Sequence, residues 1–188
     1  MVGNDLKTKI KEVAVNHFNR DGYYGATIRN ITRDVDCSLP MVYYYYQSKK
    51  DLFHEIIKKD YFDLLKRQAE LINEKTILDF YIEFVFKINF LSDYEKKVYR
   101  LGVKVYLSFD GDEELMEMMD KWEESIIPRH YQIVSPYLKD IQEEGKKMVI
   151  VRTLVHLLEN LIEQIVVKNR SLSKNEIREE LSLIIGNI

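Results

Sequence analysis

Hydrophobic residues recur at helical spacing along almost the whole chain. Near the amino terminus Ile10, Val13, Ala14 and Phe18 stand at positions i, i+3, i+4 and i+8, which places them on one face of a helix. Polar breaks separate such segments, and most breaks end in a residue that caps helices. Four of these caps have an acidic residue three positions later, as in a capping box. The pattern predicts an all-α fold of about nine helices.

The same punctuation predicts where each helix begins and ends. Asp21-Gly22 ends the first helix, because glycine suits the positive φ of a helix terminus. Pro40 is tolerated in a first turn, where its missing N–H has no helical partner. The expected helices run from Asn4 or Asp5 to Gly22, over Thr27–Val35, over Ser38–Tyr46, from Ser48 to about Glu70, from Thr76, from Ser92 to near Gly111, from Asp112 to just before Pro128, from Ser135 to Gly145, over Lys146–Asn169, and from Ser173 onward.

Composition narrows the class of protein. Only seven glycines and three prolines stand among 188 residues, too few for the turns of an all-β fold. The single cysteine, Cys37, fits a reducing compartment. Residues 1–7 lack a signal-peptide pattern, and the apolar stretch 77–91 is interrupted by charges and too short to span a bilayer. We therefore expect a cytoplasmic, soluble helical protein.

Charge is distributed unevenly along the chain. The net charge of −3 argues against bulk coating of nucleic acid. Residues 1–54 carry a net charge of +2 and the remainder −5. This small excess permits the first part to face nucleic acid.

Two short helices joined by a tight turn, Thr27–Val35 and Ser38–Tyr46, have the dimensions of a helix-turn-helix, although an ordinary helical hairpin has them too. The run Tyr43-Tyr44-Tyr45-Tyr46 favours the first reading. Successive helical residues lie about 100° apart, so with Val42 and Tyr46 inward, Tyr43 and Tyr44 point largely to solvent. Exposed phenols suit a duplex, because the hydroxyl donates to phosphate and the ring packs on sugar or a thymine methyl.

Three helix starts in this region offer backbone N–H groups to phosphate, at Thr27, Ser38 and Ser48. Thr27 and Ser38 can equally be plain caps, and the two roles are compatible. Lys49 and Lys50 lie where cations oppose the helix dipole. They indicate either a nearby anion or a solvated lysine pair.

These residues carry a family resemblance. The segment Gly22–Ile31, then Ser38, the tyrosine run, Ser48-Lys49 and Leu52-Phe53 resemble the amino-terminal domain of the TetR (tetracycline-repressor-like) family of transcriptional regulators. The match covers about residues 10–53 without gaps. The resemblance implies a dimeric helical repressor whose variable carboxy-terminal domain binds an inducer.

The resemblance also implies roles for single residues. Thr27, Tyr43 and Lys49 would hold phosphates, and Tyr45 would lie near the backbone. The residues expected against bases are Leu39, Pro40, Met41 and Tyr44. Arg29 and Ser38 complete the expected DNA-binding set.

Four positions depart from the family pattern. Asp36 stands where the turn usually has glycine, and aspartate tolerates left-handed geometry better than most residues. Thr32 replaces a usual small alanine. Leu39 and Pro40 replace a common lysine and glycine, so readout shifts toward apolar contact with thymine methyls.

Beyond about residue 60 only physical patterns guide the prediction. The segment 77–91 is apolar nearly all round, so we expect a buried helix, which is core, a pocket wall or both. Pockets of helical domains lie between helices. The candidate lining residues for a mostly apolar, aromatic effector are Tyr61, Tyr81, Phe84, Tyr99, Trp122, Ile126 and Tyr131, with Asn89, Arg100 and His130 as polar anchors.

The last two predicted helices carry apolar stripes. The stripe of residues 146–169 is wider than one partner helix covers, so two helices from each subunit can form a four-helix dimer interface; packing within one chain is the alternative. The expected interface residues are Leu154, Leu158, Leu161, Ile165, Ile177, Leu181 and Ile184.

The sequence gives little support for a catalytic or metal-binding site. No Ser-His-Asp set or phosphate loop is readable, and Lys58 stands where the zinc-protease pattern that begins at His54-Glu55 needs its second histidine. His130 and His156 are more typical of hydrogen-bonded core residues. We therefore expect no enzyme, no metal and no cofactor.

The functional prediction is a ligand-responsive transcriptional regulator that binds a palindromic DNA operator as a homodimer and is released by a small effector. The resemblance implies repression, and activation is the alternative. Residues 1–54 would bind DNA, and residues 55–188 would bind the effector and form the dimer. The alternative is an architectural or partner-binding protein without an inducer.

Overall fold

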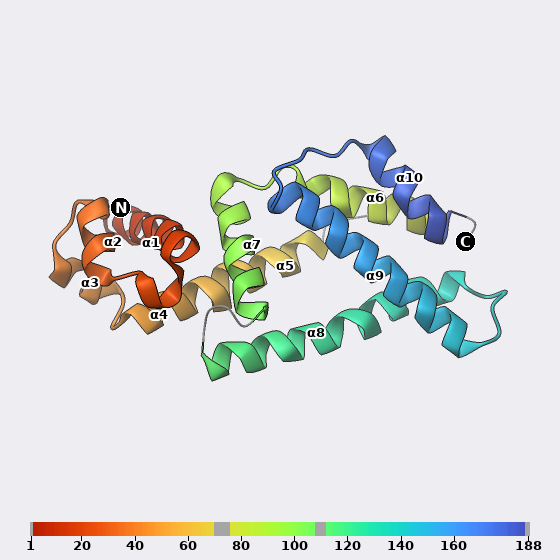
Figure 1. Cartoon of the computed structure of the whole chain (residues 1–188), viewed down its shortest axis with the longest axis horizontal. Coiled ribbons are helices and arrows are strands. Elements are labelled where there is room, and N and C mark those ends of the chain that lie inside the picture. The colour runs from red at the N-terminus through yellow and green to blue at the C-terminus, as the bar shows by residue number, and fades with distance from the viewer. Residues whose placement is uncertain (1, 70–75, 108–111, 187–188) are drawn as a thin grey trace. The chain divides into compact units, whose positions relative to one another are not determined.

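A computed structural model describes residues 2–69, 76–107 and 112–186. The described residues form helices and their connections, with no strand among them, which confirms the all-α prediction. The helices, labelled in Figure 1, are α1 (Val2–Gly25), α2 (Ile28–Val35), α3 (Leu39–Tyr45), α4 (Lys49–Glu55), the π-helix η1 (Ile56–Tyr61), α5 (Phe62–Ala69), α6 (Ile77–Ile88), α7 (Asp93–Tyr106), α8 (Glu113–Val134), the 3₁₀-helix η2 (Ser135–Tyr137), α9 (Glu144–Val166) and α10 (Lys174–Ile185).

Most predicted caps are confirmed. The side chains of Thr27, Ser48 and Thr76 each accept a hydrogen bond from the backbone N–H three residues on. Ser92 and Ser173 form complete capping boxes. Ser38 precedes α3 but makes no side-chain cap bond. Gly22 has φ 71° and kinks α1 where the sequence predicts its end.

The region around Pro128 was predicted wrongly. Helix α8 runs through Pro128 to Val134, and the segment expected as a helix from Ser135 to Gly145 is a single 3₁₀ turn followed by non-helical residues before α9. Pro128 is exposed, as is Glu124 one turn before it, so the carbonyl that loses its partner faces water. The predicted ends near Glu70 and Gly111 lie outside the described residues.

The chain divides into two compact units, of residues 1–66 with 92–119 and residues 67–91 with 120–188. The first unit therefore extends past the predicted boundary at residue 54 and includes a later segment. In this unit α1 packs against α2, α4 and α7, and α7 packs against η1. Gly102 of α7 permits this contact, because a Cβ there would overlap the ring of Tyr61.

The core of the first unit is aromatic. The rings of Phe18 and Phe53 meet edge to face with centroids 4.9 Å apart, and Tyr23 lies 4.9 Å from Phe53. Tyr46, the last tyrosine of the run, is also buried. Among the described residues its hydroxyl finds no hydrogen-bond partner, so this group is desolvated without compensation.

Replacing Tyr46 by phenylalanine is expected to raise the free energy of unfolding by about 1 kcal/mol, because an unpaired buried hydroxyl is removed and the ring is kept. Urea unfolding followed by circular dichroism measures the change. Tyr46→Ala is the comparison and should destabilise by about 3–5 kcal/mol. A clear loss of stability in Tyr46→Phe would mean that the hydroxyl is hydrogen-bonded.

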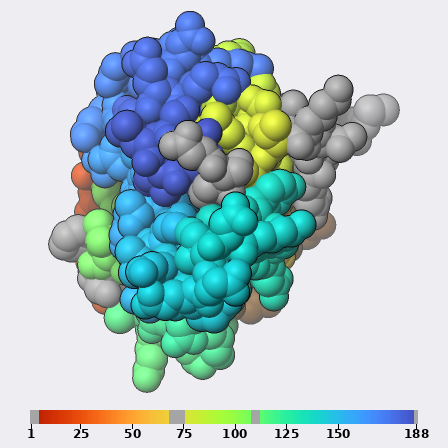
Figure 2. All heavy atoms as spheres, turned by 90° about the vertical axis from the view of Figure 1, so that its right-hand side faces the viewer, coloured from red at the N-terminus to blue at the C-terminus, as the bar shows by residue number. Residues whose placement is uncertain are grey.

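The second unit is built on α6, α9 and α10, which pack against one another. Figure 2 shows α10, in blue, beside α6, in yellow. The predicted burial of the segment 77–91 holds for Ile77, Tyr81, Ile82, Val85 and Ile88, whereas Phe90 is largely exposed. None of the helices among the described residues has the length and hydrophobicity needed to cross a membrane.

The residues predicted for a dimer interface are mostly covered within a single chain. Six of the seven, Leu154, Leu158, Leu161, Ile165, Ile177 and Leu181, are buried in the second unit. Only Ile184 keeps partial exposure. The stripe of α9 is wide because α6 and α10 both pack on this helix, so these six side chains have no surface left for a second copy.

Candidate nucleic-acid interface

A tight turn joins α2 to α3. Asp36 adopts the left-handed conformation with φ 60°, which agrees with the expectation that aspartate can replace the usual glycine here. The N–H groups of Asp36 and Cys37 donate to the carbonyls of Arg33 and Thr32, each at 3.2 Å. Thr32 is buried and its hydroxyl donates to the carbonyl of Ile28 at 2.7 Å, so the larger residue is accommodated.

The tyrosine run is divided between core and solvent. Val42 and Tyr46 are 0% and 1% exposed, whereas Tyr43 is 48% and Tyr44 is 78% exposed. The ring of Tyr45 is half-buried and meets that of Tyr44 edge to face, with centroids 5.0 Å apart. Large exposed rings on a short helix indicate a surface that something covers.

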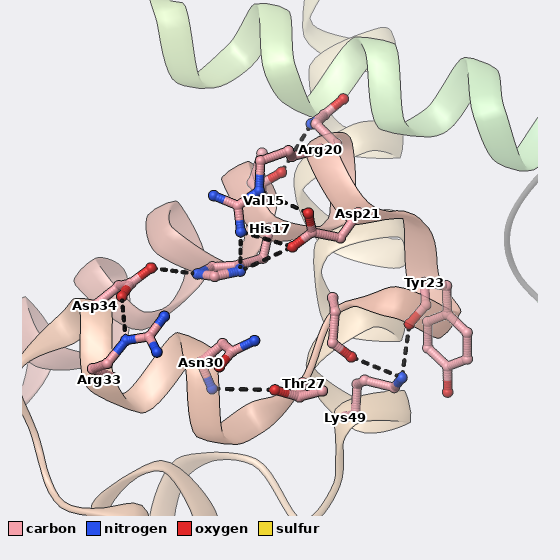
Figure 3. Close-up of polar contacts among 12 residues, drawn as sticks. Val15, His17, Arg20, Asp21, Tyr23, Thr27, Asn30, Arg33, Asp34 and Lys49 are labelled. Carbon is pink, nitrogen blue, oxygen red and sulfur yellow. Dashed lines mark hydrogen bonds and ion pairs between the residues drawn. The ribbon is translucent and has the colours of Figure 1, made fainter.

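The remaining candidate DNA contacts come from α2 and α3. Thr27, Arg29, Ser38, Pro40 and Met41 are exposed, and Leu39 is half-buried. Thr27 caps α2 by accepting from the N–H of Asn30 at 3.2 Å (Figure 3). The exposed side chains thus lie on the α2–turn–α3 segment.

Lys49 has partners inside the chain. Its ammonium donates to the carbonyls of Tyr23 at 2.7 Å and Ala26 at 3.0 Å, and it lies 4.5 Å from the centroid of the Tyr23 ring (Figure 3). Lys49 therefore ties the start of α4 to the segment before α2. Two of the three donors of this ammonium are thus used within the chain.

Lys50 forms an ion pair with Asp112, so the anion next to this lysine lies within the chain. The two side chains are 2.7 Å apart. His54 Nε2 lies 2.9 Å from the same carboxylate and Nδ1 lies 3.6 Å from Glu114, which also pairs with Lys58. Three groups of metal-ligand type thus lie together, but lysines already balance both carboxylates.

Asp112 also caps α8. Its carboxylate accepts from the N–H of Leu115 at 3.1 Å. Burial opposes ionisation of Asp112, yet the hydrogen bonds from Lys50, Leu115 and His54 prevail and lower its pKa to about 2. The carboxylate is therefore charged at neutral pH.

Sequence reasoning missed a buried histidine between α1 and α2. His17 is 2% exposed, and its ring nitrogens face Asp34 at 2.8 Å and Arg20 at 2.9 Å (Figure 3). Arg20 also forms two hydrogen bonds of 2.7 Å with Asp21, and mainly through them the pKa of Asp21 falls to about 2. The i to i+4 spacing of His17 and Asp21 was the one signal available from the sequence.

A comparison with known families matches the amino-terminal part of the chain. Residues 10–56 match the family described as bacterial regulatory proteins, tetR family. Over these residues the chain resembles TetR-type transcriptional regulators, as the sequence predicted. The matched residues include α2, the turn, α3 and α4, and regulation rather than catalysis agrees with the expectation that the chain is not an enzyme.

Proteins similar to this chain include negative transcriptional regulators of the biofilm operon icaADBC, named IcaR. The protein from Staphylococcus aureus strain Newman is 27% identical over 100 residues, 53% of each chain. The protein from Staphylococcus epidermidis is 25% identical over 138 residues, 72% of this chain and 66% of the relative. The match to the first relative thus spans about half of its length.

Solved TetR-type structures share the fold. A TetR-like transcriptional regulator from Rhodococcus sp. RHA1 superposes with a TM-score of 0.71 at 14% identity, covering 96% of this chain and 93% of that one. A TetR-family transcriptional regulator from Bordetella parapertussis gives 0.66 at 18% identity, covering 95% and 93%.

The predicted effector-lining residues are divided between the two units. Tyr61, Tyr99 and Arg100 belong to the first unit, and the other seven belong to the second. Asn89, proposed as a polar anchor, uses both amide hydrogens on the carbonyls of Phe86 and Leu172. Its role in the structure is to hold the segment before α10.

Tyr81 and His130, both predicted to line an effector pocket, are in contact with each other. The buried Tyr81 hydroxyl lies 2.7 Å from His130 Nδ1, and the two rings stack with centroids 5.6 Å apart. Burial, with a smaller effect of Arg129, lowers the pKa of His130 to about 4. The imidazole is therefore neutral at pH 7 and shares a hydrogen bond with the Tyr81 hydroxyl.

The pKa of His130 predicts a pH dependence of stability. Between pH 6.5 and about 4, His130 is protonated in the unfolded chain but stays neutral in the folded unit. The free energy of unfolding therefore falls by up to about 1.4 kcal/mol for each pH unit of acidification. Urea unfolding between pH 7 and 4.5 should show a weaker slope in His130→Gln. The exposed His156→Gln is the control, and an unchanged slope in His130→Gln would contradict the assignment.

Proposed function

We propose that this chain is a transcriptional repressor that binds a palindromic operator as a dimer and leaves it when a small effector binds. The observation that carries the proposal is the exposed pair Tyr43 and Tyr44 on α3, whose opposite face is buried. The family match of residues 10–56 supports DNA binding. The relatives named as negative regulators support repression rather than activation.

The exposed groups suit the two parts of a duplex. The hydroxyl of Tyr43, the N-terminus of α2 at Thr27 and the remaining donor of Lys49 can bind phosphates and fix the orientation of the protein. Leu39, Pro40, Met41 and Tyr44 offer mostly apolar surface to base edges in the major groove. The sequence preference then rests largely on thymine methyl groups.

The dimer places two copies of α3 about 34–36 Å apart, one turn of DNA. Because the apolar stripe of α9 is covered within the chain, we assign the dimer surface to exposed side chains of α9 and α10. The candidates are Val149 and Leu183, with Ile184 retained from the sequence prediction.

The effector acts by preferring one of two conformations. It can shift the balance only as far as its affinities for the DNA-binding and released forms differ. The half-buried His130, stacked on the buried Tyr81, offers ring surface and a hydrogen-bonding group in the second unit, which suits a mostly apolar, aromatic molecule. Native mass spectrometry of the purified protein tests for such a ligand.

Selection of duplexes from a random library by the purified protein tests the DNA-binding proposal. The expected result is an inverted repeat with half-sites one helical turn apart, protected symmetrically in a footprint. Binding without sequence preference would favour an architectural protein instead. A library that yields no bound duplex would overturn the proposal.

Leu39→Ala is expected to change the preference among operator variants, because Leu39 would contact a thymine methyl. The loss should be about 5- to 10-fold on duplexes that carry the thymine and small where it is replaced. Competition binding with single-base variants measures this difference. A uniform loss across all variants would make Leu39 a structural residue.

A further inference from the structure

The chemistry around His17 assigns its protons. Two groups lie close to His17 Nδ1: Arg20 Nη2 at 2.9 Å and the carboxylate oxygen Asp21 Oδ2 at 3.3 Å. An arginine guanidinium has only donors, so the shorter of the two contacts assigns Nδ1 as an acceptor. The proton then sits on Nε2 and is donated to Asp34 Oδ2 at 2.8 Å.

The bond from His17 anchors the end of α2. Asp34 lies in the last turn of α2, where the helix dipole disfavours a carboxylate. Hydrogen bonds from Arg33 and then from His17 offset this cost and lower the pKa of Asp34. Asp34 stands two residues before Asp36, whose left-handed backbone turns the chain into α3. Fixing Asp34 therefore fixes the turn that leads into α3.

We propose that His17 is a positioning residue for DNA binding: its Nε2–H ties the end of α2 to α1 and so sets the direction of α3. The chain Asp21–Arg20–His17–Asp34–Arg33 holds the imidazole in one orientation (Figure 3). This inference rests on the proposed function, because its readout is affinity for DNA. The geometry of the clamp can be tested without DNA.

Nitrogen-15 NMR of the histidine side chains at pH 8 tests the geometry. The expected spectrum shows His17 protonated at Nε2 and unprotonated at Nδ1, with the assignment made by loss of the signal in His17→Phe. In Asp34→Leu the Nε2–H signal should shift as its acceptor is lost. A proton on Nδ1, alone or together with one on Nε2, would overturn the assignment.

A double-mutant cycle tests the positioning role on the duplex selected by the wild-type chain. His17→Phe and Asp34→Leu should each weaken binding about 10-fold, and the double variant no more than either alone, since both break one bond. Asp34→Asn should stay within about 2-fold of wild type, because its amide oxygen still accepts. Wild-type affinity in both single variants, or about 100-fold loss in the double, would contradict the role.

The controls separate the possible failures. Asp93→Leu and Lys97→Leu break an ion pair on α7, away from the proposed DNA and dimer surfaces, and should leave affinity unchanged. Binding is measured below the unfolding midpoint of every variant. Asp34 is partly exposed, so the Asp34→Leu variant can still be tested if His17→Phe does not fold. If the wild type selects no duplex, the proposed function fails, while the NMR spectrum still decides the clamp.

Discussion

Replacing Tyr43 and Tyr44 together by alanine is expected to weaken binding to the selected duplex about 100-fold. Each phenol would contribute one phosphate or base contact, and such contacts are worth about 1–3 kcal/mol each. Both rings already face solvent, so their removal leaves the core intact. Fluorescence anisotropy at fixed salt measures the affinity, and circular dichroism measures the unchanged unfolding.

Matched variants locate the effect. Tyr43→Phe removes one hydroxyl and should cost about 10-fold, the value of one phosphate hydrogen bond. Tyr137→Ala removes a similarly exposed ring from the second unit and should change nothing. Equal affinity of wild type and the Tyr43/Tyr44 double variant would remove α3 from the interface.

Leu154→Ala is expected to lower the free energy of unfolding by about 3 kcal/mol, as for leucines deleted from well-packed cores. Leu154 is fully buried within one chain, so the loss should be the same at low and high protein concentration. Urea unfolding at two concentrations differing about 50-fold gives the measurement.

Val167→Ala, just after the end of α9, is the matched control. Val167 is exposed and not assigned to the dimer surface, so the change should stay within about 0.5 kcal/mol of wild type. A Leu154→Ala variant whose deficit vanishes at high concentration would place Leu154 between subunits, as the sequence first predicted.

Local signals made much of the fold predictable. Caps such as Thr27 and Ser92 act within three residues, and the structure shows the same bonds. The left-handed Asp36 follows from its own backbone preference. Pro128 was misjudged because proline ends a helix only where the freed carbonyl has no other partner, and here water is accessible.

The candidate site was predictable only where geometry is local. A 100° step per residue determines which tyrosines of the run face outward, and the exposures agree. Other contacts depend on tertiary packing. Lys49 contacts residues 23 and 26 positions away in the sequence, and His54 contacts a residue 58 positions away. The apolar stripe that contains Leu158 likewise predicts that another surface packs against it. The stripe does not tell whether that surface belongs to the same chain or to a second copy.

Photo-crosslinking from position 44 tests the central claim most directly. With p-benzoylphenylalanine in place of Tyr44, the account predicts crosslinks to the selected duplex at two symmetric positions about 10 base pairs apart. The same probe at Tyr137 should give none. Crosslinks from position 137 and none from position 44 would contradict an interface built on α3.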